Sequence, residues 1–239
     1  TLFRSRVVTA GAFARAVDPD ARDPLPKRWR GSGHRSVAPE DLAARLRPRL
    51  AAFGATRVAR TTGLDRIGIE CVAVARPNGR SLSVAGGKGF DRAAAWVSGV
   101  MEAAELAAAE APAIPLRFGD PDDAASWARP IDLARAPLRR PLPDRIGPSF
   151  WAEGRALRGG APAAVPFELV HCCWLAETEP AAALFDGSTN GLASGAHPAE
   201  AALHGLCELA ERDSLALFER LPPDGRARRR VDPARVDDP

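Results

Sequence analysis

The chain has 239 residues, of which 46% are hydrophobic and 26% are charged, so it can form a sizeable core and has the composition of a globular domain. Its formal net charge of +3 is too small to indicate nucleic-acid binding. No run of about 18 apolar residues could cross a membrane, and the N-terminus lacks a signal-peptide core, so we expect a cytoplasmic protein. The cysteines have no CxxC spacing and are expected to be small buried residues in a reducing compartment: Cys71, Cys172, Cys173 and Cys207.

The first part of the chain shows helix and strand signals in turn. Residues 1–30 are rich in Arg, Asp and Pro and are expected to form a loosely held N-terminal arm. Pro39-Glu40-Asp41 and the spaced apolar residues after it predict an amphipathic helix that Gly54 ends. Three strands should follow, the last two as a hairpin, over residues 56–62, 67–75 and 81–85.

The rest of the chain contains two long helices. The first is predicted from Asp91 to about residue 109. Residues 111–148 are rich in Pro and Asp without periodicity, which is typical of a functional loop or a surface excursion. A strand is predicted over 165–175, a Gly-, Ser- and Asn-rich loop over 187–195, and the second helix from Pro198 to Pro222. The expected fold class is α/β (α+β), with a mixed or antiparallel sheet packed against the two helices.

Both long helices carry carboxylates along one side. At about 100° per residue, Ser98, Glu102 and Glu105 fall within an arc of roughly 60°. No Lys or Arg lies between residues 93 and 111 to offset their charge. Clustered carboxylates, if buried, must take up protons or bind a cation, and the hard cations for oxygen ligands are Mg²⁺ and Ca²⁺. Surface glutamates are the alternative for the first helix. In the second helix an arc of roughly 80° holds Glu200, His204, Glu208 and Glu211.

Each acidic helix follows a loop that could bind phosphate. Gly86-Gly87-Lys88-Gly89 resembles a phosphate-cradling turn, but it lacks the spacing of a Walker motif, so tight-turn glycines are the alternative. Residues 188–195, which include Ser194, offer hydroxyl, amide and backbone N–H groups, although ordinary turns use the same residue types. Because each loop precedes an acidic helix, donors for phosphate and ligands for its metal would converge.

Several separate segments, in one order, resemble the YcaO family of ATP-dependent peptide-modifying enzymes. The resemblance implies a YcaO-like ATP-binding domain over residues 31–221, preceded by the arm of residues 1–30 and followed by an Arg- and Asp-rich linker or truncated tail over residues 222–239. Besides both acidic stripes and the loop at 188–195, the similar segments are Gly31-Ser-Gly-His34-Arg35, Gly63-Leu-Asp65-Arg-Ile-Gly68, Ser81-Leu-Ser-Val84, Gly87-Lys88-Gly89 and Pro166-Phe167-Glu168-Leu169.

The resemblance also implies a role for individual residues. Arg212 is the candidate catalytic residue, because a guanidinium can stabilise a transferring phosphoryl group. His34 and His204 are more typical of structural histidines than of bases. The residues implied in ATP binding are Arg35, Lys88, Ser98, Ser194 and Arg212. The implied Mg²⁺ ligands are Glu102, Glu105, Glu200, Glu208 and Glu211.

Two positions depart from the family pattern. Where the family has an asparagine after the second glycine-rich loop, this chain has Ala196, and Asp41 replaces a hydroxyl residue. Asn190 or His197 would have to supply the missing ligand. Family members also continue well past Arg212, so the chain is expected to be a fragment or to lack part of the catalytic apparatus.

The function implied by the resemblance is ATP-dependent activation of backbone amides in a ribosomally made peptide or protein. The amide oxyanion attacks the γ-phosphate of ATP, and loss of phosphate leaves an azoline ring or, with external sulfide, a thioamide. The alternatives are a nucleotide-binding accessory protein, for example for ribosomal-protein methylthiolation, and a fragment without activity. The expected partners are a peptide or protein substrate, a TfuA-like or leader-peptide-binding protein, and a second copy of the chain; neither nucleic acid nor membrane is expected.

Overall fold

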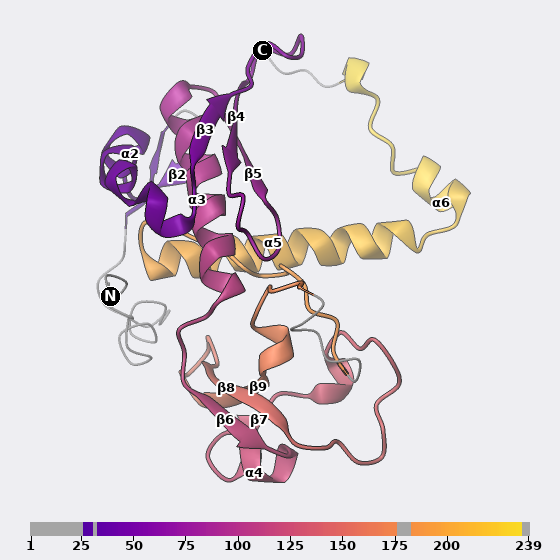
Figure 1. Ribbon diagram of the computed structural model, residues 1–239. Helices are drawn as coiled ribbons and strands as arrows, with labels where there is room; N and C mark the ends of the chain where they lie inside the picture. The colour runs from indigo at the N-terminus through magenta and orange to yellow at the C-terminus, as the bar shows by residue number, and fades with distance from the viewer. Residues whose placement is uncertain (1–25, 31–32, 176–182, 236–239) are drawn as a thin grey trace.

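The structure is a computed structural model that describes residues 26–30, 33–175 and 183–235 (Figure 1). In these ranges the strands form three sheets, of two, three and four strands. The two-stranded sheet pairs β1 (Arg28–Trp29) with β2 (His34–Arg35). The predicted boundary between residues 30 and 31 lies between these two strands in the sequence, and residues 31–32 lie outside the described residues. The rest of the predicted arm, residues 1–25, lies outside the described residues.

The first helix and its glycine stop are as predicted. α2 (Pro39–Leu46) continues into the 3-10 helix η1 (Arg47–Phe53), and Gly54 follows with a φ of 69°, a left-handed conformation that favours glycine. A three-stranded antiparallel sheet comes next, in which the strands are neighbours in chain order: β3 (Arg57–Arg60), β4 (Glu70–Ala75) and β5 (Val84–Gly89).

The phosphate-cradling turn predicted at residues 86–89 is wrong, because these residues form the last part of β5. Their glycines allow close packing against α3 (Arg92–Glu110). A Cβ on Gly89 would lie 2.7 Å from the Cβ of Ala94, and one on Gly87 would overlap the backbone of Gly99. Glycine is needed here so that a helix and a strand can touch.

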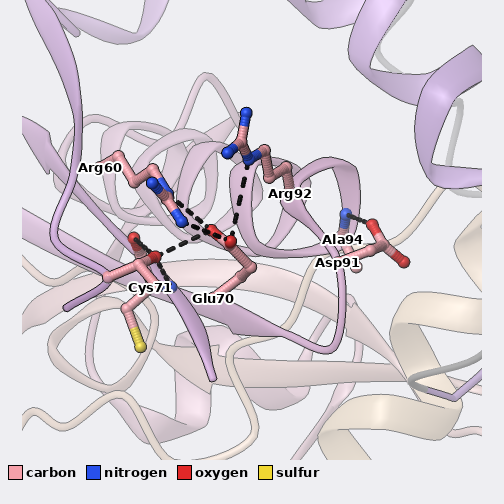
Figure 2. A network of polar contacts seen from close by, with 7 residues as sticks. Arg60, Glu70, Cys71, Asp91, Arg92 and Ala94 are labelled. Carbon is pink, nitrogen blue, oxygen red and sulfur yellow. Dashed lines mark hydrogen bonds and ion pairs between the residues drawn. The ribbon is translucent and has the colours of Figure 1, made fainter. Parts of the chain in front are cut away.

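α3 is the first acidic helix, and the hydrophobic core fixes it on the sheet. The carboxylate of Asp91 caps its N-terminus by accepting the N–H of Ala94 at 2.7 Å (Figure 2). At the other end, the buried pair Arg76 and Glu110 joins the helix to the end of β4, with Nη2 and Oε2 2.6 Å apart. The core residues are Leu46, Ala55, Val74, Ala85, Val100, Ala103 and Leu106.

A four-stranded sheet lies beyond the C-terminal end of α3 (Figure 1). Within this sheet, Trp151 is only 1% exposed and donates its Nε1–H to the Gly119 carbonyl at 2.9 Å. The strands have the spatial order β6-β8-β9-β7, and only β7 and β9 pair parallel. Their bounds are β6 (Leu116–Gly119), β7 (Arg129–Pro130), β8 (Ser149–Arg155) and β9 (Pro162–Pro166).

The segment predicted as a loop at 111–148 therefore has structure of its own. Besides β6 and β7 it contains α4 (Pro121–Ala125) and the 3-10 helix η2 (Leu133–Arg135). These elements are two to five residues long, which is too short to produce a hydrophobic period.

The strand predicted over 165–175 is wrong beyond Pro166. β9 ends there, the 3-10 helix η3 (Phe167–Leu169) follows, and residues 170–175 are irregular. Of this irregular segment, Cys172 and Cys173 are buried, whereas Trp174 and Leu175 are exposed, and Cys172 donates its N–H to the Ala109 carbonyl at 2.8 Å. Because Val165 and Pro166 belong to the four-stranded sheet, they do not join residues 67–75 and 81–85 in one sheet as expected. The α+β class, with antiparallel and mixed sheets, is confirmed.

α5 (Pro198–Glu219) is the second acidic helix and runs across α3 (Figure 1). It is followed by the short helix α6 (Pro223–Ala227) and the 3-10 helix η4 (Pro233–Arg235). No helix in the described part of the chain is long and apolar enough to cross a membrane. Cys172 and Cys173 are buried as predicted, whereas Cys207 on α5 is exposed. Several large apolar side chains of α5 are also exposed: Leu203, Leu206, Leu209, Leu215, Leu217 and Phe218.

Candidate functional site

Glu102 and Glu105 lie half-buried on α3, at the face toward β5 and α5. Burial raises the pKa of Glu102, although the backbone N–H of Gly86 and the charge of Lys88 act in the opposite direction. Burial is also the main cause that raises the pKa of Glu105, and the charges of Glu208 and Glu102 raise it further. The carboxylates of the two helices are therefore close enough to repel one another.

Glu208 on α5 is held by the loop in front of its helix and by its own neighbour. Its Oε2 accepts the N–H of Gly191 at 2.9 Å, and its Oε1 accepts Nη2–H of Arg212 at 2.6 Å. Arg212 also donates Nη1–H to Oδ1 of Asn190 and, at 3.5 Å, to Oγ1 of Thr189. The loop and α5 are thus joined at two successive turns of the helix.

Glu200, in the first turn of α5, is 6% exposed and contacts the N-terminal segment. Its Oε2 accepts both the N–H of Ser36, at 3.2 Å, and the hydroxyl of Ser36. Nε of Arg35 lies 3.9 Å from its Oε1, while the Arg35 side chain is 51% exposed. Arg35 is therefore positioned beside the acidic helix and remains open to solvent.

The structure brings some of the predicted residues together and leaves others apart. Glu105 lies close enough to Glu102 and to Glu208 for their charges to raise its pKa, Lys88 lies near Glu102, and Ser194 lies beside Glu105 and lowers its pKa. Ser98 and Glu211 are exposed on their helices, and Glu200 is held separately by Arg35 and Ser36.

Among the described residues, no three His, Cys, Asp or Glu side chains are grouped closely enough to form a ready metal site. The donor chemistry nevertheless fits Mg²⁺. The converging side chains Glu102, Glu105 and Glu208 offer oxygen atoms only, and carboxylate oxygens are the protein ligands that Mg²⁺ prefers. A cation between them would offset the burial and repulsion that raise the pKa values of Glu102 and Glu105.

Sequence reasoning missed Ser36 and the contacts of Asn190. Ser36 follows Arg35 directly, and its hydroxyl is the one signal that could have suggested it. Asn190, considered as a replacement ligand, instead accepts a hydrogen bond from Arg212. His197 caps α5, because its Nδ1 accepts the N–H of Ala199 at 3.2 Å. His204, in the arc of the acidic stripe, is exposed.

Comparison with models of known protein families shows which family these residues belong to. The YcaO model, described as a cyclodehydratase that binds ATP and Mg²⁺, matches residues 86–239. The chain belongs to the YcaO family. The cofactors expected from the sequence, ATP and Mg²⁺, are those that this family binds, and the expected family is confirmed.

Relatives of known sequence extend well beyond this chain. An uncharacterized protein in the tfuA 3' region of Rhizobium leguminosarum bv. trifolii is 42% identical, over 85% of this chain and 48% of that protein. An uncharacterized protein of Methanothermobacter thermautotrophicus is 34% identical, over 77% of this chain and 47% of that protein. The chain thus spans about half the length of the curated relatives it matches.

Solved structures agree with the fold. The YcaO protein of Methanopyrus kandleri, bound with AMPPCP and Mg²⁺, has a TM-score of 0.63 and 27% identity, over 82% of this chain and 48% of that one. A heterocyclase in complex with substrate and cofactor has a TM-score of 0.67 and 20% identity, over 85% of this chain and 31% of that one. The second match, at this identity, shows the fold alone.

Proposed function

We propose that this chain supplies the ATP- and Mg²⁺-binding site of an enzyme that activates peptide backbone amides by phosphorylation. The observation that carries the proposal is the position of Glu105 on α3 near both Glu102 on the same helix and Glu208 on α5, in surroundings that raise the pKa values of both α3 carboxyls. Residues 31–221 would form the ATP-binding domain, as the resemblance of the sequence implies.

The arrangement supports a division of roles. Glu102, Glu105 and Glu208 would hold Mg²⁺, which when bound supplies positive charge to the triphosphate. Lys88 and Arg212 are exposed cations beside Glu102 and Glu208, and Arg35 is an exposed cation beside Glu200; all three would bind phosphate oxygens. The predicted ligand Glu211 and the predicted ATP contact Ser98 lie exposed on the same two helices and would join the site from there.

In the reaction, a nucleophile adds to the carbon of a backbone amide, and the resulting oxyanion attacks the γ-phosphorus of ATP as ADP leaves. Loss of phosphate then gives an azoline when the nucleophile is a side chain of the peptide, or a thioamide when it is external sulfide. Arg212 would stabilise the charge on the transferring group. The tfuA-region relative supports the thioamide outcome, with a TfuA-like protein as the sulfur-delivering partner.

The first test measures the binding of ATP by calorimetry with and without Mg²⁺. Replacing Glu105→Gln or Glu208→Gln keeps the size of the side chain but removes one negative ligand. We expect the Mg²⁺-dependent affinity to fall by about one to a few kcal/mol. Glu219→Gln, an exposed glutamate at the end of α5, is the matched control. Equal affinities in all four proteins would mean that Glu105 and Glu208 are surface glutamates, and the proposal would fail.

An accessory role is the second candidate, and Ala196 favours it, because the family has an asparagine at this position. The two candidates differ in phosphate release. A protein of the relatives' full length that contains this chain should release phosphate from ATP when given sulfide and a peptide substrate, whereas an accessory protein would bind ATP without releasing phosphate. This chain by itself should bind Mg·ATP weakly and turn over no peptide, and Ala196→Asn should strengthen the binding if residue 196 faces the metal.

A further inference from the structure

We infer that Asn190 is a positioning residue that orients Arg212 toward the terminal phosphate of ATP, and that the turn of residues 189–192 sets Glu208 and Arg212 as one unit. This inference rests on the proposed function, since it needs a nucleotide beside α5. It assigns a task to a loop amide that the acidic stripes and their metal do not use.

The turn holds α5 at two points with two different groups. Leu192 donates its N–H to the Thr189 carbonyl at 3.0 Å, which closes the turn. From within the turn, the N–H of Gly191 binds Oε2 of Glu208 at 2.9 Å, and Oδ1 of Asn190 accepts Nη1–H of Arg212. Because Glu208 and Arg212 are four residues apart, one rigid turn fixes both side chains on the same face of the helix.

The turn cannot slide along the helix, because its backbone touches α5 directly. A Cβ on Gly205 would lie 2.6 Å from the Gly191 carbonyl oxygen, so any side chain at residue 205 would displace the turn. Gly191 has a φ of 77°, which other residues rarely adopt, and a Cβ there would lie 3.1 Å from Cδ1 of Leu209. Oγ of Ser188 accepts the N–H of Asn190 at 3.2 Å and holds the asparagine backbone in place.

The amide is suited to this task because it is an uncharged acceptor. Glu208 already pairs with Nη2 of Arg212, and a second carboxylate would neutralise the guanidinium further. An asparagine oxygen fixes the plane of the guanidinium while leaving its charge for phosphate. The Arg212 side chain is 44% exposed, so donors of the same group remain accessible to a ligand.

The experiment compares the affinities of this chain for Mg·ATP and Mg·ADP, by calorimetry. Because Arg212 is the proposed partner of the terminal phosphate, Asn190→Ala should weaken ATP binding about tenfold and leave ADP binding within about twofold. Asn190→Asp should weaken ATP at least as much, since it keeps an acceptor but adds negative charge. Asn190→Gln should recover part of the loss. The control is Asn78→Ala, which replaces an asparagine in an exposed turn far from Asn190 in the sequence.

A cycle with Arg212→Ala separates positioning from simple support of the fold. If Asn190 acts through Arg212, Asn190→Ala should have no further effect on ATP binding in the Arg212→Ala background. Equal losses for ATP and ADP, together with a lower melting temperature, would mean that Asn190 is structural and would overturn the inference. A changed Mg²⁺ requirement in Asn190→Ala would make it a metal ligand and overturn it as well.

The outcomes also separate this inference from the proposed function. Suppose that the wild-type chain binds Mg·ATP, that Glu208→Gln loses this binding and that Asn190→Ala keeps it. In that case only the positioning role of Asn190 fails. If neither the wild-type chain nor a protein of the relatives' full length that contains it binds Mg·ATP, the proposed function fails and the positioning role fails with it.

Discussion

The two acidic helices carry similar carboxylate stripes but are held in place by different forces. α3 lies on the three-stranded sheet, where Val100, Ala103 and Leu106 are at most 3% exposed. α5 buries only Glu200 and Gly205 among its residues, and the polar contacts of Ser36, Gly191 and Asn190 attach it to the rest. The carboxylates of α3 are thus positioned by the hydrophobic core, whereas those of α5 are positioned by loops.

The largest effect on stability is expected when the buried ion pair of Arg76 and Glu110 is broken. Arg76 is 3% exposed and Glu110 is 7% exposed, and removing either would leave the other charged group buried without its partner. We expect Glu110→Ala or Arg76→Ala to lower the free energy of unfolding by about 3–5 kcal/mol, measured by urea denaturation. Arg228→Ala, which breaks an exposed pair with Asp224, should change it by less than about 0.5 kcal/mol. A small effect at Arg76 would mean that α3 is not anchored there.

The same substitution in both helices tests the comparison directly. In Gly99→Ala on α3, the new Cβ would lie 2.8 Å from Cγ2 of Val72, and we expect overpacking to cost about 1–3 kcal/mol of stability. In Gly205→Ala on α5, the new Cβ would push the Gly191 turn away from the helix. Alanine favours the helix by about 0.8–1 kcal/mol at both positions, but the turn on α5 lies outside the hydrophobic core and can shift, so the stability of Gly205→Ala should change little while its Mg·ATP affinity falls. Denaturation measures the stability of both variants, and calorimetry measures their affinity for Mg·ATP. A larger stability loss in Gly205→Ala than in Gly99→Ala, with unchanged Mg·ATP affinity, would contradict the prediction.

This contrast also explains how far the sequence could predict the site. The stripes Ser98–Glu105 and Glu200–Glu211 follow from helical periodicity, and the helix stop at Gly54 follows from its preference for a left-handed backbone. The contact between Ser36 and Glu200 joins residues 164 positions apart, and no local pattern marks it. Residues 86–89 were misassigned because glycine suits both a turn and close packing of a helix on a strand.

A third prediction concerns pH and addresses the α3 carboxylates. The pKa of Glu105 is raised above its ordinary value of 4.5, so the folded state binds a proton that the unfolded state releases more readily. Without Mg²⁺, stability should therefore fall as the pH rises from about 4.5 through the raised pKa. Glu105→Gln should remove this part of the slope and raise the melting temperature at neutral pH by up to about 2–4 °C. Saturating Mg²⁺ should remove the difference between the two proteins if Glu105 is a ligand. If Glu105→Gln leaves the pH dependence of stability unchanged, that dependence comes from other titratable groups.

The smallest effect on stability is expected at the other end of β4, where the partly buried Glu70 pairs with arginines that are exposed to solvent. Glu70 accepts two hydrogen bonds from Arg60, at 2.7 and 2.9 Å, and one from Thr62 at 2.8 Å, and Nε of Arg92 lies 3.8 Å away (Figure 2). The hydrogen bonds from Arg60 and Thr62 lower the pKa of Glu70 to about 2.

A lowered pKa adds stability above the ordinary value of 4.5 that is lost as the pH falls toward about 2. Glu70→Gln should therefore matter near neutral pH and have no effect at the lowest pH. Because the arginines are exposed to solvent, salt near 1 M, where the Debye length is about 3 Å, should reduce the effect of Glu70→Gln, whereas it should leave that of Glu110→Ala almost unchanged. Urea denaturation of both variants at low and high salt makes this measurement. An equal salt response would mean that burial does not distinguish the two ends of β4, and that the core does not anchor α3 through Arg76.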